Sequence, residues 1–176
     1  SIHLISKLLW FPKKGNCLSL GPGAGSAELN LIIKYKWCVD AVDIEQHSYN
    51  VMKQALNPTQ LKKLNFQTTS FENAKFSKKY NYILAYDSLP FMSKDKFDYT
   101  FSEIVKHANK GCVFAISLFG NKNCLVKNKL AFSMTKGEIV TLFKTHKIEI
   151  LFIERKSHIR KIGGLFDSFE IIGQKN

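Results

Sequence analysis

The sequence is poor in the residues that mark extracellular, metal-binding and membrane-spanning proteins. It has only four cysteines in 176 residues, and no two of them have the C-x-x-C spacing of zinc and redox motifs. Cys17, Cys38 and Cys112 fall in apolar segments that read as buried strands, where a reduced thiol packs as a small hydrophobic group. We therefore expect no disulfide, no metal site and a cytoplasmic location. No apolar run reaches membrane-spanning length, so no membrane partner is expected.

Acidic residues are scarce beside the basic ones. The chain has 26 Lys and Arg residues against 14 Asp and Glu, which gives a formal net charge of +12. An excess of this kind is typical of nucleic-acid-binding proteins. Here the lysines are scattered, and residues 155–161 form the one dense basic cluster, which we interpret as a solvated hairpin. A nucleic-acid partner is therefore disfavoured, and no sequence feature indicates an oligomeric state.

The strongest pattern is a glycine-rich turn between a short apolar run and a helical segment. Residues 16–20 have the length of one buried parallel strand. Gly21, Gly23 and Gly25 follow at alternate positions, and Ser26 is the expected N-cap of the next helix. Such a turn lets the backbone approach a ligand closely, and the helix N-terminus directs unpaired N–H groups at that ligand.

A second apolar segment, residues 37–43, ends in an acid. Asp43 stands about twenty residues beyond the turn, the separation at which a carboxylate at the end of the next strand reaches both hydroxyls of a ribose. The turn and the acid together predict a nucleoside-containing cofactor.

The glycine spacing distinguishes two classes of such cofactors. A dinucleotide-binding motif has its third glycine three residues after the second, whereas here it follows after two, as Gly21-x-Gly23-x-Gly25. With this motif the sequence resembles the class I S-adenosylmethionine-dependent methyltransferases over nearly its whole length. Within that class it resembles the small bacterial enzymes of the tellurite-resistance and thiopurine type. The resemblance implies S-adenosylmethionine as cofactor, S-adenosylhomocysteine as product and methyl transfer to a small molecule.

The resemblance also implies a fold. We expect a Rossmann-like α/β protein with a seven-stranded, mostly parallel sheet, an antiparallel last strand and helices on both faces. Residues 1–176 then form a single domain, with residues 1–14 as a helical segment packed on the core. The later strands are expected at 65–71, 82–85, 112–119, 148–153 and 166–173. Helices are expected at 96–108, which Gly111 ends, and after the capping box of Thr135 and Glu138.

The cofactor site implied by the resemblance follows the ends of the parallel strands. The glycine turn is expected to hold the cofactor, and Asp43 its ribose. Ile44 and Phe71 are expected to cover the two adenine faces, while Ser70 bonds the adenine amine. The full expected set is Gly21, Pro22, Gly23, Gly25, Asp43, Ile44, Ser70, Phe71, Ala85 and Tyr86.

The methyl acceptor is expected beside the end of the fourth strand. Ligands of open α/β sheets lie outside the carboxyl ends of the strands, at the point where the strand order reverses. Asp87 is the candidate catalytic base there, and Tyr86 is the residue that orients it. A soft sulfur, selenium or tellurium nucleophile needs no strong base, whereas an oxygen or nitrogen acceptor has to lose a proton.

Position 19 departs from the family pattern. The resembling enzymes carry an acid two residues before the first glycine, which commonly helps to fix the cofactor's ammonium group, and this chain has Ser19. Two alternatives to a small-molecule methyltransferase therefore stay open. The first, favoured by Ser19, is a cofactor-binding or regulatory protein with this fold and no turnover. The second is a nucleic-acid methyltransferase that uses residues 155–161.

Overall fold

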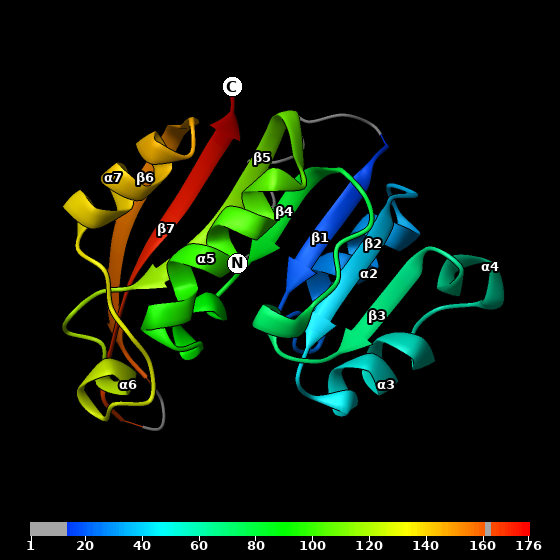
Figure 1. Ribbon diagram of the computed structural model, residues 1–176. Helices are drawn as coiled ribbons and strands as arrows, with labels where there is room; N and C mark the ends of the chain where they lie inside the picture. Colours follow the sequence, from blue (N-terminus) through cyan, green and yellow to red (C-terminus); the bar gives the residue numbers. More distant parts are fainter. Residues whose placement is uncertain (1–13, 161–162) are drawn as a thin grey trace.

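Seven strands form one sheet in the order β3-β2-β1-β4-β5-β7-β6 (Figure 1). The structure, a computed structural model, describes residues 14–160 and 163–176, so the expected helical segment at 1–14 lies outside the described residues except for Lys14. The strands are β1 (Asn16–Leu20), β2 (Cys38–Asp43), β3 (Leu64–Thr68), β4 (Tyr80–Ala85), β5 (Ala108–Phe119), β6 (Ile148–Ile159) and β7 (Leu165–Lys175).

The strand directions confirm the predicted sheet. β1 runs parallel to β2 and β4, as do β3 to β2 and β5 to β4. β7 lies between β5 and β6 and is antiparallel to both. The arrowheads of β1, β2 and β3 therefore point to one edge of the sheet and that of β7 to the opposite edge (Figure 1). The carboxyl ends of the parallel strands share the edge at which ligands of such sheets bind.

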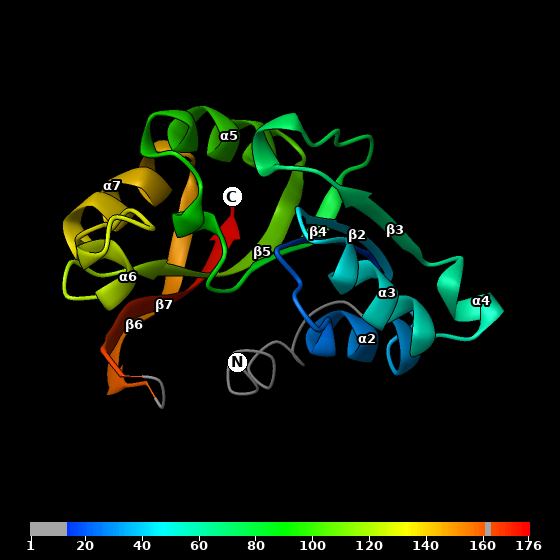
Figure 2. The same ribbon diagram turned by 90° about the horizontal axis from the view of Figure 1, so that it is seen from below.

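Helices cover both faces of the sheet, as predicted. They are α2 (Ser26–Ile33), α3 (Gln46–Gln54), α4 (Pro58–Leu61), α5 (Lys94–Lys106), α6 (Cys124–Lys127) and α7 (Lys136–Thr145), with 3-10 turns η2 (Phe71–Asn73) and η3 (Leu89–Phe91). α2 and α3 lie on one side of the sheet, and α5 and α7 on the other (Figure 2). None of the described helices is long and apolar enough to span a membrane.

Alternating side chains along the strands fill two cores. β1 contributes Leu18 and Leu20 to the core that also contains Phe97 and Phe101 of α5, and Cys17 to the core that also contains residues of α2. Both phenylalanines are essentially inaccessible to solvent, and burial of each contributes roughly 1.5–3 kcal/mol. Cys17 is a buried free thiol, which agrees with its expected packing as a small hydrophobic group.

The predicted boundary between α5 and β5 is wrong. α5 ends at Lys106, and Ala108 already begins β5. Gly111 therefore ends no helix. It lies inside β5 with a φ angle of +77°, next to a shift in the register between β4 and β5. Between Tyr80 and Tyr82 of β4 the chain of β5 advances by five residues, from Ala108 to Val113, and a glycine helps a strand to accommodate such an irregularity.

Other strands also differ in length from the prediction, among them β3 and β6. β3 stops at Thr68, because Ser70 and Phe71 turn the chain into η2. β6 continues to Ile159, because every residue from Phe152 onward pairs with β7 up to the hairpin. The capping box of Thr135 and Glu138 is confirmed at the start of α7.

Candidate functional site

The glycine turn joins β1 to α2 through three left-handed backbone conformations. Gly21, Gly23 and Gly25 have φ angles of +69°, +56° and +69°, which favour glycine. A Cβ atom at Gly21 would lie 2.5 Å from Ser88 Cβ, and one at Gly25 would lie 2.4 Å from Met52 Cγ. At Gly23 it would meet no atom of the described residues within 4 Å. Packing therefore requires the outer two glycines, while the middle one leaves the turn open on one side.

α2 begins without a side-chain cap. The prediction that Ser26 is the N-cap is wrong, because Gly25 holds that position and Ser26 is the first helical residue. The helix therefore begins one residue earlier than expected, and the Pro22 carbonyl accepts a hydrogen bond from Gly25 N at 2.9 Å. Glycine has no side-chain acceptor, so it leaves the first N–H groups of the helix available to a ligand.

Asp43 lies at the end of β2 and faces the turn. Its Oδ2 atom is 3.4 Å from Gly23 N and accepts a hydrogen bond from Ser48 Oγ at 3.1 Å, while Oδ1 accepts one from Glu45 N at 3.1 Å. The side chain is only partly buried. The structure thus brings the predicted ribose ligand against the glycine turn.

The residues expected around the adenine follow the ends of β2 and β3. Ile44 exposes 67% of its surface, which is unusual for an isoleucine next to a buried strand. The ring of Phe71 is aimed at the turn, since its Cζ atom lies 3.6 Å from a Cβ built on Gly21. Ser70 immediately precedes Phe71 as the N-cap of η2 and is partly buried. The carboxyl edge therefore presents apolar surface beside the turn and Asp43.

Asp87 follows β4 and is held by a serine of β5. Ser117 Oγ donates to Asp87 Oδ1 at 2.6 Å and accepts from Asp87 N at 2.6 Å. Asp87 has a left-handed φ angle of +52°, and burial raises the pKa of its carboxyl although the Ser117 bond opposes the shift. The buried Ala85 ends β4, and Ser88 Oγ donates to the Leu20 carbonyl at 2.6 Å, which ties the end of β4 to that of β1.

Tyr86 contacts a different carboxylate. Its hydroxyl donates to Glu170 Oε1 at 2.6 Å, and Lys156 Nζ donates to Glu170 Oε2 at 2.5 Å. Burial raises the pKa of the Tyr86 hydroxyl, and its bond to Glu170 adds to the shift. Burial raises the pKa of the Glu170 carboxyl, but the hydrogen bonds from Lys156 and Tyr86 outweigh burial and hold this pKa below its usual range. Ser117 supplies two hydrogen bonds that hold Asp87, and the orienting role of Tyr86 stays a prediction.

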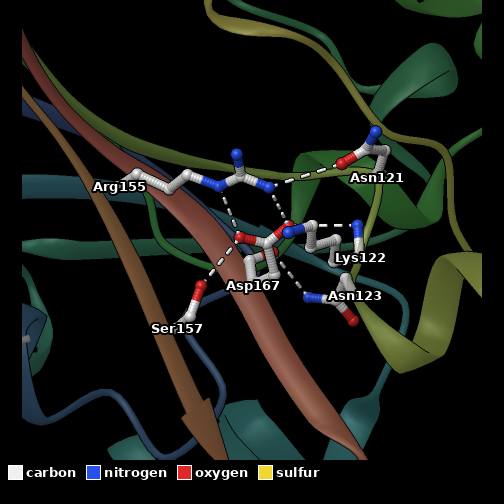
Figure 3. Close-up of polar contacts among 6 residues, drawn as sticks. All are labelled: Asn121, Lys122, Asn123, Arg155, Ser157 and Asp167. Atoms are coloured by element: carbon white, nitrogen blue, oxygen red, sulfur yellow. Dashed lines mark hydrogen bonds and ion pairs between the residues drawn. The ribbon is translucent and has the colours of Figure 1, made fainter.

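A third carboxylate lies at the base of the β6–β7 hairpin. Asp167 is fully buried and accepts 2.8 Å hydrogen bonds from Arg155 Nε and Nη2 (Figure 3). Ser157 Oγ and Lys122 N add bonds of 3.0 Å each. The bonds from Arg155 are the main reason that the pKa of Asp167 is lowered to about 2. The predicted solvated hairpin is present, since Arg155, Ser157, His158 and Ile159 are exposed, but two of its cations, Arg155 and Lys156, also pair with acids of β7.

One acid near the turn was not singled out by the sequence. Glu28, in the first turn of α2, is buried, and its Oε1 atom accepts a hydrogen bond from Ser19 Oγ at 2.6 Å. Position 19 is where the resembling enzymes carry an acid. A local signal was available, because acids favour the first turn of a helix.

Comparison with known proteins gives a family match for most of the chain. The family model described as "Tellurite resistance protein TehB" matches residues 7–161. No curated protein matches the chain.

Solved structures resemble the whole fold. A SAM-dependent methyltransferase from Methanosarcina mazei is 17% identical, with a TM-score of 0.71 over 97% of this chain and 96% of its own. TehB from Haemophilus influenzae is 15% identical, with a TM-score of 0.80 over 100% of this chain and 62% of its own. The N-methyltransferase NodS from Bradyrhizobium japonicum, solved in complex with S-adenosyl-L-homocysteine, is 10% identical, with a TM-score of 0.70 over 91% and 77%. At these identities the likeness shows a shared fold.

Proposed function

The chain belongs to the family described as tellurite resistance protein TehB, and from this membership we propose that it binds S-adenosylmethionine and transfers the methyl group to a small molecule. One observation carries the proposal. The glycine turn is open at Gly23, and the Asp43 carboxylate lies against it at the carboxyl edge of the sheet. A nucleoside held there would have its ribose within reach of an acid and its polar end at a helix N-terminus.

The residues at this edge fit the proposed cofactor. Asp43 would hold the ribose hydroxyls through charge-assisted hydrogen bonds, and its contacts with Ser48 and Gly23 already fix the direction of the carboxylate. The exposed Ile44 and the ring of Phe71 offer apolar surface to an adenine. Ser70, Ala85 and Tyr86 remain in the proposed site, because they follow or end neighbouring strands of the same edge.

The chain's own part in catalysis is to position the reactants. When bound, the cofactor supplies a methyl group that its sulfonium centre activates for in-line displacement. The ends of β1 and β4 are joined by the Ser88 bond to Leu20, so the cofactor turn and the acceptor segment are held at a fixed separation. Alignment of this kind, with exclusion of water, accounts for a large share of the rate in bimolecular transfers.

Asp87 is the proposed base for acceptors that have to lose a proton. Burial raises the pKa of its carboxyl, which makes it a stronger base than an exposed aspartate. Ser117 holds the carboxylate at 2.6 Å, so that one oxygen is fixed and the other is available to the acceptor. Tyr86, which follows β4, donates a hydrogen bond to Glu170 of β7, and β5 lies between these two strands.

We propose a small, soft nucleophile of the sulfur, selenium or tellurium class as the acceptor. The family's description names tellurite resistance, and a tellurium oxyanion needs no deprotonation before it attacks a methyl group. The net charge of +12 favours the approach of anions to the protein. A nucleic-acid acceptor is weakened as an alternative, because Arg155 and Lys156 pair with Asp167 and Glu170.

We also propose that the chain forms a single domain and acts in the cytoplasm. One sheet holds all seven strands, which supports a single domain over residues 1–176. All four cysteines are free thiols, which supports the cytoplasm as the location.

Transfer of a labelled methyl group tests the proposed function. The protein is incubated with methyl-labelled S-adenosylmethionine and, in separate reactions, tellurite, selenite, a small thiol, tRNA and duplex DNA. We expect label in a small methylated product and none in the nucleic acids. Asp87→Asn should lower the rate more for an N–H or O–H acceptor than for a soft anion. Label found only in nucleic acid would overturn the small-molecule proposal, and cofactor binding without transfer to any acceptor would favour the non-catalytic alternative.

A further inference from the structure

Four acidic side chains are buried in the described part of the molecule, and three of them have a basic partner. Asp40 pairs with Lys78 at 2.7 Å, Asp167 with Arg155 at 2.8 Å and Glu170 with Lys156 at 2.5 Å. The fourth, Glu28, forms no ion pair with any described Lys, Arg or His. In a chain with 26 basic residues, an unpaired buried carboxyl is the exception.

The surroundings of Glu28 are polar but uncharged. Ser19 Oγ donates to it at 2.6 Å. Burial is the main cause that raises the pKa values of the Cys17 thiol and the Tyr82 hydroxyl, and the charge of Glu28 adds to both shifts. Burial in turn raises the pKa of Glu28. A buried carboxylate without a cation costs several kcal/mol, so such a group either keeps its proton or receives a positive charge from a ligand.

Glu28 lies next to the place where a cation is expected to bind. It is the third residue of α2, immediately after the glycine turn, and it bonds the residue two positions before Gly21. S-adenosylmethionine carries an ammonium group on its amino-acid end. The Glu28 carboxyl therefore lies between β1 and the first turn of α2, the two elements that the glycine turn joins.

We propose that Glu28, oriented by Ser19, provides the negative charge that pairs with the ammonium group of the cofactor. The carboxylate that the resembling enzymes carry on the strand at position 19 is supplied here from the neighbouring helix. The inference rests on the proposed function, because it takes S-adenosylmethionine as the ligand. With Glu28 in this role, the absence of an acid at position 19 no longer favours a cofactor-binding protein without turnover.

Three adenosine thioethers separate this role from a structural one. S-adenosylhomocysteine carries the ammonium and the carboxylate, its decarboxylated derivative keeps only the ammonium, and 5'-methylthioadenosine has neither. The substitution Glu28→Gln keeps the shape of the side chain and its contact with Ser19 but removes the charge. Isothermal titration measures the binding of each of the three ligands to this variant. We expect the first two ligands to bind about 10- to 100-fold more weakly, the size of one charge-assisted hydrogen bond, and 5'-methylthioadenosine to change less than about twofold.

A purely structural role predicts a different pattern. An acid in the first helical turn also stabilises the helix dipole, and its loss would weaken all three ligands equally or none of them. Equal changes for all three ligands would overturn the inference. If the wild-type protein binds none of the three, the proposed function itself fails, so the two failures are distinguishable.

Three further variants complete the test. Ser19→Asp combined with Glu28→Gln returns the carboxylate to the strand, and we expect it to restore most of the lost affinity for S-adenosylhomocysteine. Asp40→Asn removes a buried carboxylate of the same sheet that already has a basic partner, and it should lower the melting temperature with the affinity ratio of the three ligands unchanged. If Glu28→Gln does not fold, Ser19→Ala serves instead, with a several-fold loss confined to the two ammonium ligands. A uniform change there would contradict the inference.

Discussion

The carboxylates near the ends of β1 and β2 and those in the β6–β7 hairpin differ in the partners that they bind. Around Asp167 every partner comes from the chain itself, with Arg155, Ser157 and Lys122 supplying four hydrogen bonds. Around the glycine turn, Asp43 accepts hydrogen bonds from neutral backbone and hydroxyl groups and pairs with no described cation. Gly23 faces open space, and Glu28 pairs with no described cation either. Polar groups that are satisfied internally stabilise the fold, and groups left unsatisfied near an opening are available to a ligand. The contrast supports the proposal that the glycine turn binds a ligand and that the basic hairpin has a structural role.

The largest effect is expected from the hairpin carboxylate. Asp167→Ala removes the partner of the partly exposed Arg155 and leaves Lys122 N and Ser157 Oγ without their acceptor. Because each hydrogen bond to a charged group contributes about 1.5–3 kcal/mol, we expect a total loss of about 3–5 kcal/mol. Urea unfolding measures the change. Ser157→Ala, which loses one hydrogen bond, should cost about 0.5–1.5 kcal/mol. A stable Asp167→Ala variant with weakened cofactor binding would reverse the assignment of the two regions.

Two glycines of the same turn should separate packing from binding. Gly25→Ala places a methyl group 2.4 Å from Met52 Cγ at a φ angle of +69°, and strain with overpacking costs about 2–4 kcal/mol. Gly23→Ala has the strain without the clash, about 1–2 kcal/mol. Its methyl group would occupy the open side of the turn, so it should lose more affinity for S-adenosylhomocysteine than stability. Denaturation and titration of both variants check this, and equal stability losses would contradict it.

Asp43→Ala should weaken cofactor binding in a folded protein. Each charged hydrogen bond to the ribose that is lost costs about 1.5–3 kcal/mol, whereas the partly exposed side chain contributes little to stability. Glu45→Gln, a neighbouring exposed acid, is the matched control and should leave the affinity within about twofold. Titration with S-adenosylhomocysteine measures both. An unchanged affinity in Asp43→Ala would place the ribose elsewhere.

The smallest effect is expected for nucleic acid. Arg160, whose guanidinium lies 5.5 Å from the centre of the Phe166 ring, is the described cation of the cluster best placed to reach a phosphate. In a gel-shift assay at about 150 mM salt, where exposed charges are screened, we expect no binding by the wild-type protein or by Arg160→Ala. Binding that survives this salt and disappears in Arg160→Ala would return the hairpin to the functional surface.

The parts of the fold that depend on residues close together in the sequence could be predicted from the sequence. β1 occupies the predicted positions 16–20, and Asp43 ends β2 as expected, because strand length, glycine spacing and a terminal acid are all local features. The N-cap of α2 could not be located to the residue. It depends on how many left-handed glycines the turn contains, which packing against Ser88 and Met52 decides.

The acceptor side could be predicted only in part. The sequence offers Asp87 and Tyr86 as candidates because they follow a strand, whereas Ser117 and Glu170 lie in strands whose sequence indicates only core. These two residues are register partners across β5 and β7, and that register exists only because β7 inserts between β5 and β6. Tertiary pairing of this kind leaves no local signal. No local signal indicates the contact between Lys156 and Glu170 either, because it depends on the register between β6 and β7.

Isothermal titration of the wild-type protein with S-adenosylhomocysteine and, separately, with NAD tests the central claim most directly. The account predicts saturable binding of S-adenosylhomocysteine at the glycine turn and weaker or no binding of NAD, because the spacing of Gly21, Gly23 and Gly25 is that of a methyltransferase. Tighter binding of NAD, or no binding of S-adenosylhomocysteine at near-millimolar concentration, would contradict it.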